Sequence, residues 1–174
     1  MFDLDSAVRK IKDFPKPGIL FYDITSVFEN NSAFNYVCDR LIETYKDIKI
    51  DRVIGIEARG FLLAPIIAKV KNIPIVLARK KGKLPGETYS MSYSLEYGTA
   101  EIEIHKSDLK TNENILIVDD LIATGGTIDA VCKIVEQTGN NVEGIFSIID
   151  LPFLNYKEKL GKYNITSLLS YDSE

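Results

Sequence analysis

Short runs of β-branched and aliphatic residues alternate with longer helical patterns through most of this chain. Buried parallel strands are continuous apolar runs, and the helices that connect them cover both faces of the sheet. The pattern predicts an α/β fold with an open, mainly parallel sheet flanked by helices. The expected strands are residues 52–56, 73–79, 115–118, 142–149 and 165–169, and the expected helices are residues 32–45 with Ser32 as the cap, 61–70, 127–137 and 154–160.

Residues 84–105 depart from this alternation. They contain two strand-like runs with Tyr97-Gly98 near the turn between them, and the second run alternates strictly between glutamate and isoleucine. Alternating runs on either side of a turn indicate a β-hairpin. We expect a flexible hairpin that stands off the main sheet and covers a site.

Length and composition limit the possible partners. A chain of 174 residues is long enough for one hydrophobic core, so we expect a single domain over residues 1–174. The net charge of −4 provides no general basic surface for nucleic acid, and no apolar run approaches the ~18 residues that span a membrane. Cys38 and Cys132 each lie in an apolar helix-like stretch, which favours reduced thiols over a disulfide or a zinc site. We expect a soluble cytoplasmic protein without nucleic-acid or membrane partners.

The segment after residues 115–118 carries the strongest chemical signal. An apolar strand leads into two aspartates, a glycine-containing loop and a helical pattern. Such a loop directs backbone N–H groups at an anion, and ligands of open α/β sheets bind beyond the carboxyl ends of strands. Threonine hydroxyls add donors, and the aspartates can accept hydrogen bonds from ribose hydroxyls. The expected ligand is a ribose 5-phosphate, bound by Asp119, Asp120, Ala123, Thr124, Gly125, Gly126 and Thr127.

Two other interpretations of this loop can be compared with it. The first is an ordinary strand-to-helix turn whose aspartates and threonines only cap the helix, and this interpretation stays open. The second is a nucleotide triphosphatase, which needs a glycine-rich loop ending in Gly-Lys-Ser or Gly-Lys-Thr. Gly82-Lys83 precedes leucine and Gly161-Lys162 precedes tyrosine, so the sequence does not supply that loop.

Residues 118–127, Val-Asp-Asp-Leu-Ile-Ala-Thr-Gly-Gly-Thr, resemble the phosphoribosyl pyrophosphate motif of type I phosphoribosyltransferases. Residues 13–21, 57–61, 79–86 and 93–98 are similar, in the same order, to segments of the adenine phosphoribosyltransferases, so the likeness extends over nearly the whole chain. It implies transfer of the 5-phosphoribosyl group from phosphoribosyl pyrophosphate to adenine, which gives AMP and pyrophosphate. It also implies a homodimer, and Mg²⁺ bound mainly through phosphoribosyl pyrophosphate with no direct protein ligand.

The same resemblance implies a pyrophosphate site. Its residues would be Glu57, Ala58, Arg59, Arg79, Lys80 and Lys83. In the family the peptide between Glu57 and Ala58 is expected to be cis, so that both N–H groups point at pyrophosphate. From the residues alone, Arg59 could equally be a surface side chain, and the basic run at 79–83 could be a solvated loop.

Residues 1–30 would form a hood over the base, with adenine held by Leu20, Phe21 and Tyr22. Adenine presents an amino donor where other purines present a carbonyl, so backbone carbonyls suit it better than a lysine. Phe21 could stack on the purine or belong to the core. Family members often carry arginine at the position of Tyr22, so we expect recognition through the backbone there.

Glu96 is the expected catalytic residue. Ribosyl transfer passes through a cation-like anomeric centre, and a proton-transfer group beside the base accelerates it. Glu96 lies in the hairpin next to Tyr97-Gly98, where closure would exclude water. From sequence alone a solvent-facing strand glutamate is the competing interpretation.

Two rival functions remain at this point. One is a regulator that binds phosphoribosyl pyrophosphate without turnover, although the short, non-basic N-terminal stretch leaves little room for a DNA-binding segment. The other is an enzyme of the same fold that accepts hypoxanthine, guanine or xanthine. Rates with the free bases distinguish them.

Overall fold

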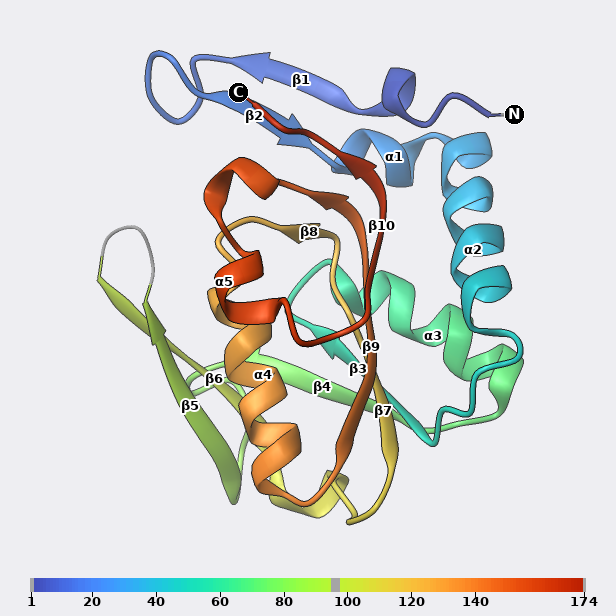
Figure 1. Ribbon diagram of the computed structural model, residues 1–174, viewed down its shortest axis with the longest axis vertical. Helices are drawn as coiled ribbons and strands as arrows, with labels where there is room; N and C mark the ends of the chain where they lie inside the picture. Colours follow the sequence, from blue (N-terminus) through green and yellow to red (C-terminus); the bar gives the residue numbers. More distant parts are fainter. Residues whose placement is uncertain (1, 95–97, 174) are drawn as a thin grey trace.

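The computed structural model describes residues 2–94 and 98–173, and it has a central sheet between two helical layers (Figure 1). The main sheet has the strand order β10-β9-β7-β3-β4-β6-β5, with β8 paired to β9. Its strands are β3 (Arg52–Ile56), β4 (Ile75–Lys80), β5 (Thr88–Ser94), β6 (Thr99–His105), β7 (Asn114–Val118), β8 (Leu121–Ile122), β9 (Asn141–Asp150) and β10 (Ile165–Ser170). The helices are α1 (Thr25–Glu29), α2 (Asn31–Tyr45), α3 (Gly60–Lys71), α4 (Gly126–Gln137) and α5 (Lys157–Leu160), with 3₁₀ turns η1 (Asp5–Ala7), η2 (Lys106–Asp108) and η3 (Pro152–Leu154). The expected parallel α/β fold is confirmed.

Alternation along the strands explains the two layers. Successive side chains of a strand point to opposite faces, so β7 contributes Leu116 and Val118 to one cluster and Ile115 and Ile117 to the other. The first cluster contains the apolar faces of α2 and α3, and the second contains those of α4 and α5. The central strands are therefore apolar on both faces, as the continuous apolar runs predict.

The hairpin at residues 84–105 is confirmed as β5 and β6, which pair antiparallel from Thr88↔His105 to Ser94↔Thr99. It does not stand apart from the main sheet, because β6 pairs antiparallel with β4 at Arg79↔Glu103 and Lys80↔Ile102. Ile102 and Ile104 are buried in the second cluster, and this burial explains the connection. The hairpin continues the sheet at the β4 edge.

Three further details differ from the expectations. The side chain that caps α2 is that of Asn30, whose Oδ1 accepts a hydrogen bond from the Ala33 N–H at 3.1 Å, and not that of Ser32. The helix expected over 154–160 is interrupted because Asn155 adopts a left-handed conformation with φ +56°, and only Lys157–Leu160 is α-helical. The third difference is that α1 and β8 were not expected, because neither is long enough to carry a periodic pattern.

The N-terminal segment forms a small sheet of its own. Strands β1 (Arg9–Lys12) and β2 (Leu20–Asp23) pair antiparallel, and the C-terminal end of the chain runs beside β2 (Figure 1). In the part of the chain that the structure describes, no helix is long and apolar enough to cross a membrane.

Candidate active site

The site forms where the parallel strands end. Strands β3, β4, β7 and β9 point the same way, so the segments that follow them meet at one edge of the sheet. This edge brings together residues 57–59 and 79–83, which were predicted to bind pyrophosphate, and residues 119–127, which were predicted to bind ribose 5-phosphate. It also brings residues 151–154 to the same edge, which the sequence analysis did not assign to a site.

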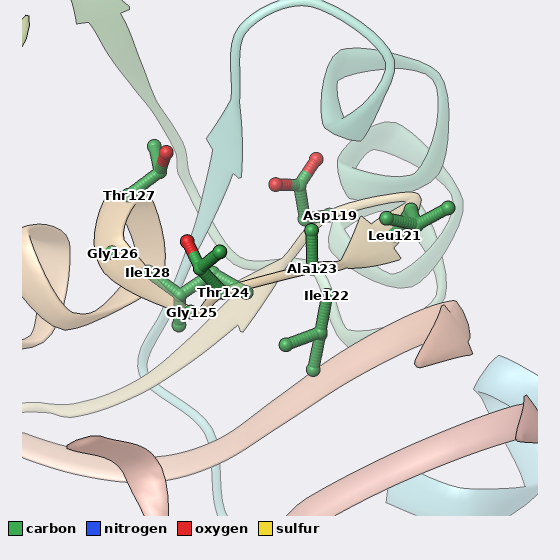
Figure 2. A pocket seen from close by; sticks show the side chains of 9 residues that line it. All are labelled: Asp119, Leu121, Ile122, Ala123, Thr124, Gly125, Gly126, Thr127 and Ile128. Carbon is green, nitrogen blue, oxygen red and sulfur yellow. The ribbon is translucent and has the colours of Figure 1, made fainter. Parts of the chain in front are cut away.

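The loop from β7 to α4 encloses a cavity of about 90 Å³. Its lining consists of Asp119 and residues 121–128. Gly125 precedes α4 with φ +73°, a left-handed conformation that glycine adopts without strain. The first turn of α4 then presents N–H groups with no partner inside the helix. Figure 2 shows the Thr124 and Thr127 hydroxyls and the Asp119 carboxylate on one side of the loop, with Ile122 pointing the opposite way. The loop can therefore bind a phosphate through backbone and hydroxyl donors.

The two aspartates have different surroundings. Asp119 lines the cavity and is partly exposed, and burial together with the neighbouring Asp120 carboxylate raises its pKa. Asp120 is only 4% exposed and lies outside the lining of this cavity. Its Oδ2 lies 2.6 Å from Nε of Arg59. Of the two carboxylates, Asp119 lines the cavity and Asp120 pairs with Arg59, and the contact of either with a ribose hydroxyl stays a prediction.

Arg59 follows β3, and the peptide between Glu57 and Ala58 is cis, as the family resemblance implies. The side chain of Arg59 is 46% exposed, so it is accessible to a ligand while paired with Asp120. Because Asp120 belongs to the loop after β7, this ion pair joins the expected pyrophosphate segment to the expected phosphate segment.

Glu57 organises the basic segment. Its Oε2 accepts a hydrogen bond from the Lys80 N–H at 3.0 Å, and its carboxylate pairs with the Arg79 guanidinium at 3.3 Å. Burial acts to raise the pKa of Glu57, but the hydrogen bonds from Lys80 and Arg79 outweigh it and the pKa is lowered. Arg79 also donates to the Lys83 carbonyl at 3.1 Å, whereas the Lys80 and Lys83 residues are exposed. The Glu57 carboxylate therefore anchors the cationic loop, and a contact of the Glu57 backbone with pyrophosphate stays a prediction.

Helix α3 begins in direct contact with the end of β7. A Cβ added at Gly60 would lie 2.5 Å from the Val118 carbonyl oxygen and 3.4 Å from the Asp119 Cα. Only glycine allows the backbone to approach so closely. This contact fixes the start of the phosphate loop against the segment that carries Arg59.

A second, mostly apolar cavity of about 460 Å³ lies under the N-terminal sheet. Its lining consists of Pro15, Lys16, Ile19, Leu20, Phe21, Tyr22, Leu121, Ala123, Leu151, Phe153 and Leu154. It therefore brings together the three residues expected to bind the base, and it shares Leu121 and Ala123 with the phosphate-loop cavity. The wall formed by residues 151–154 was missed, although their position just beyond a strand end was a usable signal.

Aromatic contacts fix two residues of β2 that line this cavity, Phe21 and Tyr22. Phe21 lies edge-on to Phe14 with ring centroids 5.0 Å apart, and it lines the cavity rather than the core clusters. Tyr22 is only 6% exposed and stacks on Tyr171 with centroids 4.0 Å apart and an interplanar angle of 12°. Tyr22 therefore has a packing role that an arginine could fill only by stacking its guanidinium.

Glu96, the expected catalytic residue, lies outside the described residues. The strand that leads to it ends beside the phosphate loop, because a Cβ on Gly126 would lie 3.0 Å from the Ser94 carbonyl oxygen. The hairpin thus approaches the N-terminus of α4 at the position where a ligand phosphate would bind.

Comparisons with known proteins agree with this geometry. Residues 25–152 match the model of the phosphoribosyl transferase domain family. The adenine phosphoribosyltransferase of Treponema denticola is 52% identical over 98% of this chain and 90% of its own length. The crystal structure of the Thermoanaerobacter pseudethanolicus adenine phosphoribosyltransferase has a TM-score of 0.90 at 44% identity and covers 97% of this chain and 98% of that one.

The Saccharomyces cerevisiae adenine phosphoribosyltransferase was crystallised with D-2,5-dideoxy-2,5-imino-altritol 1,6-bisphosphate and adenine. It has a TM-score of 0.87 at 38% identity and covers 95% of this chain and 96% of that one. The family match and these likenesses span the phosphate loop and the strand ends described above. The chain belongs to the phosphoribosyltransferase family, within the adenine phosphoribosyltransferases.

Proposed function

We infer that this protein transfers the 5-phosphoribosyl group from phosphoribosyl pyrophosphate to adenine, which releases AMP and pyrophosphate. The observation that carries the inference is the pair of adjoining cavities, one apolar and large enough for a purine, the other lined by a phosphate-binding loop. The yeast relative, crystallised with a bisphosphate and adenine, supports this pairing of ligands.

The two cavities suggest a role for each segment. The 5-phosphate would lie on Thr124–Thr127, the ribose beside Asp119, and pyrophosphate near Arg59, Arg79 and the exposed Lys80 and Lys83. Backbone groups of Leu20, Phe21 and Tyr22 would recognise adenine. The buried Asp120 would act through Arg59, because its carboxylate does not line the cavity. Glu96 would move the proton at the base.

Mg²⁺ would be held mainly by phosphoribosyl pyrophosphate. Among the described residues no group of three or more His, Cys, Asp or Glu side chains is arranged to hold a metal ion. Mg²⁺ commonly binds through substrate phosphates and waters with few carboxylates, and the Asp119 carboxylate could meet it from the cavity wall. The ion would neutralise charge on the leaving pyrophosphate.

A steady-state assay with phosphoribosyl pyrophosphate, Mg²⁺ and each free base in turn tests this function. We expect AMP and pyrophosphate to form rapidly with adenine and at background rates with guanine, hypoxanthine and xanthine. Turnover of one of those other purines instead of adenine would contradict the assigned acceptor. Binding of the donor without turnover of any base would indicate the regulator.

Thr124→Val should weaken donor binding. Thr124 lines the cavity with its hydroxyl on the same side of the loop as the Asp119 carboxylate (Figure 2), and losing one hydrogen bond to a charged group costs about 1–3 kcal/mol. Isothermal titration with phosphoribosyl pyrophosphate and Mg²⁺ measures this change. Thr44→Val is the matched control, since the Thr44 hydroxyl donates to the Arg40 carbonyl on α2. Equal affinity in Thr124→Val and the control would exclude this side chain as a ligand.

We also propose a homodimer formed through α3 and β4. Leu62 and Val70 of α3 and Ile75 and Leu77 of β4 are between 39% and 56% exposed, and large apolar side chains exposed in this way suit a protein–protein interface. Because Val76 and Ala78 face the α4 layer, Ile75 and Leu77 point to the side of the sheet that α3 covers. A second copy would bury all four side chains.

Leu77→Glu should convert the dimer to a monomer, because the dimer would bury an unpaired carboxylate at its interface. Light scattering coupled to size exclusion measures the mass of each form. Lys157→Glu is the control, because Lys157 is exposed on α5, on the opposite face of the sheet from α3, and this variant should stay dimeric. A monomeric wild type at all concentrations would contradict the proposal.

We also propose a cytoplasmic location for the protein. Cys38 and Cys132 are both free, and burial raises the pKa of the Cys132 thiol to about 12. Unpaired thiols are typical of reducing compartments.

A further inference from the structure

One wall of the base cavity is formed by β2, which belongs to the small sheet of β1 and β2. Among the strands that the structure describes, β1 and β2 pair only with each other and do not join the main sheet. A two-stranded sheet alone is marginally stable at best, so contacts with the rest of the chain must fix its place. Tyr22 of β2 lines the cavity, and its ring also contacts a residue outside the two-stranded sheet.

That contact is Tyr171, which follows β10. Its ring stacks on Tyr22 at 4.0 Å between centroids. Its hydroxyl donates to the Asp5 carboxylate, which also accepts from Lys10 Nζ at 2.7 Å. Lys10 Nζ in turn lies 5.3 Å from the centroid of the Tyr171 ring. Tyr171 is thus attached to both ends of the N-terminal segment, through η1 and β1 on one side and β2 on the other.

The backbone of Tyr171 is attached to the opposite wall. Its N–H donates to the Asp150 carbonyl at 3.1 Å, and the next residue, Leu151, lines the base cavity. The Leu151 N–H donates to the Ile122 carbonyl at 2.9 Å, inside the phosphate loop. Tyr171 therefore connects the two facing walls of the cavity, although it does not line the cavity itself.

We propose that Tyr171 is a positioning residue for the base cavity: by stacking on Tyr22 it sets the distance between β2 and Leu151, and so the fit of the purine. This role rests on the proposed function. Burial and the Asp5 carboxylate raise the pKa of the Tyr171 phenol, so the phenol stays protonated and keeps donating to Asp5 near neutral pH.

Steady-state kinetics of Tyr171→Ala and Tyr171→Phe test the proposal. Phenylalanine keeps the stacked ring and loses only the hydrogen bond to Asp5. We expect Tyr171→Ala to raise the KM for adenine about five- to tenfold, in line with the strength of an aromatic pair, and to leave the KM for phosphoribosyl pyrophosphate within about twofold. Tyr171→Phe should have a KM for adenine close to that of the wild type.

Tyr36→Ala is the matched control, because the Tyr36 ring packs on Phe2 with centroids 5.4 Å apart and does not line the cavity. An unchanged adenine KM in Tyr171→Ala, or an equal rise in both KM values, would overturn the positioning role. If Tyr171→Ala does not fold, Tyr171→Leu keeps apolar volume without an aromatic face and should show the same selective rise; unchanged adenine KM there overturns the role.

The proposed function can fail independently of this role. A wild type that forms no AMP would contradict the function, and calorimetry with adenine would then replace kinetics. A selectively weaker adenine affinity in Tyr171→Ala would still support positioning, whereas equal adenine affinities would overturn it.

Discussion

Replacing Gly60 with alanine should destabilise the protein by about 3 kcal/mol, the upper end of what overpacking usually costs. The new Cβ would lie 2.5 Å from the Val118 carbonyl oxygen, and both groups are backbone, so neither can rotate away. Chemical denaturation measures the loss. The same displacement should raise the KM for phosphoribosyl pyrophosphate, because Val118 leads directly into the phosphate loop.

Gly139→Ala is the control for backbone strain alone. Gly139 has φ +74° and nothing within 4 Å of an added Cβ, so alanine there should cost about 1–2 kcal/mol without affecting donor binding. Wild-type stability in Gly60→Ala would mean that α3 can shift away from β7 without consequence, and would contradict the close packing described here.

Glu96→Gln should lower kcat by about 10²- to 10⁴-fold, the usual contribution of general acid–base catalysis, with little change in donor affinity. The amide keeps the size of the side chain and removes its ability to exchange a proton. Single-turnover kinetics measures the chemical step, and calorimetry measures donor binding. Ser94, the last residue of β5, lies next to Gly126 at the start of α4.

Glu87→Gln is the control within the same hairpin region. Glu87 is exposed and pairs with Lys106 at 3.4 Å, so its loss should leave kcat unchanged. A kcat for Glu96→Gln equal to that of the wild type would remove Glu96 from the mechanism and leave the proton to another group.

Features that one continuous segment determines were the most predictable from the sequence. The run from Ile115 to Thr127 specifies a strand, a loop and a helix start by local rules alone, and the structure contains all of them. The buried strands were predictable for the same reason, since their apolar character follows from burial on both faces.

Features that depend on contacts between distant segments were not predictable. The far wall of the base cavity comes from residues 151–154, which the apolar pattern assigned in part to a helix that Asn155 interrupts. The pairing of Asp120 with Arg59 joins loops after two different strands. The stack of Tyr22 on Tyr171 joins the two ends of the chain, and no periodicity in either segment indicates it.

The two cavities share Leu121 and Ala123, and this common wall connects the two sites structurally. Any shift of the loop after β7 on binding of the donor phosphate would also move one wall of the base cavity. Thermodynamic linkage then requires the effect to be reciprocal: adenine changes the donor affinity by the same factor by which the donor changes the adenine affinity. A single short loop thus provides the physical route by which binding in one cavity can be felt in the other.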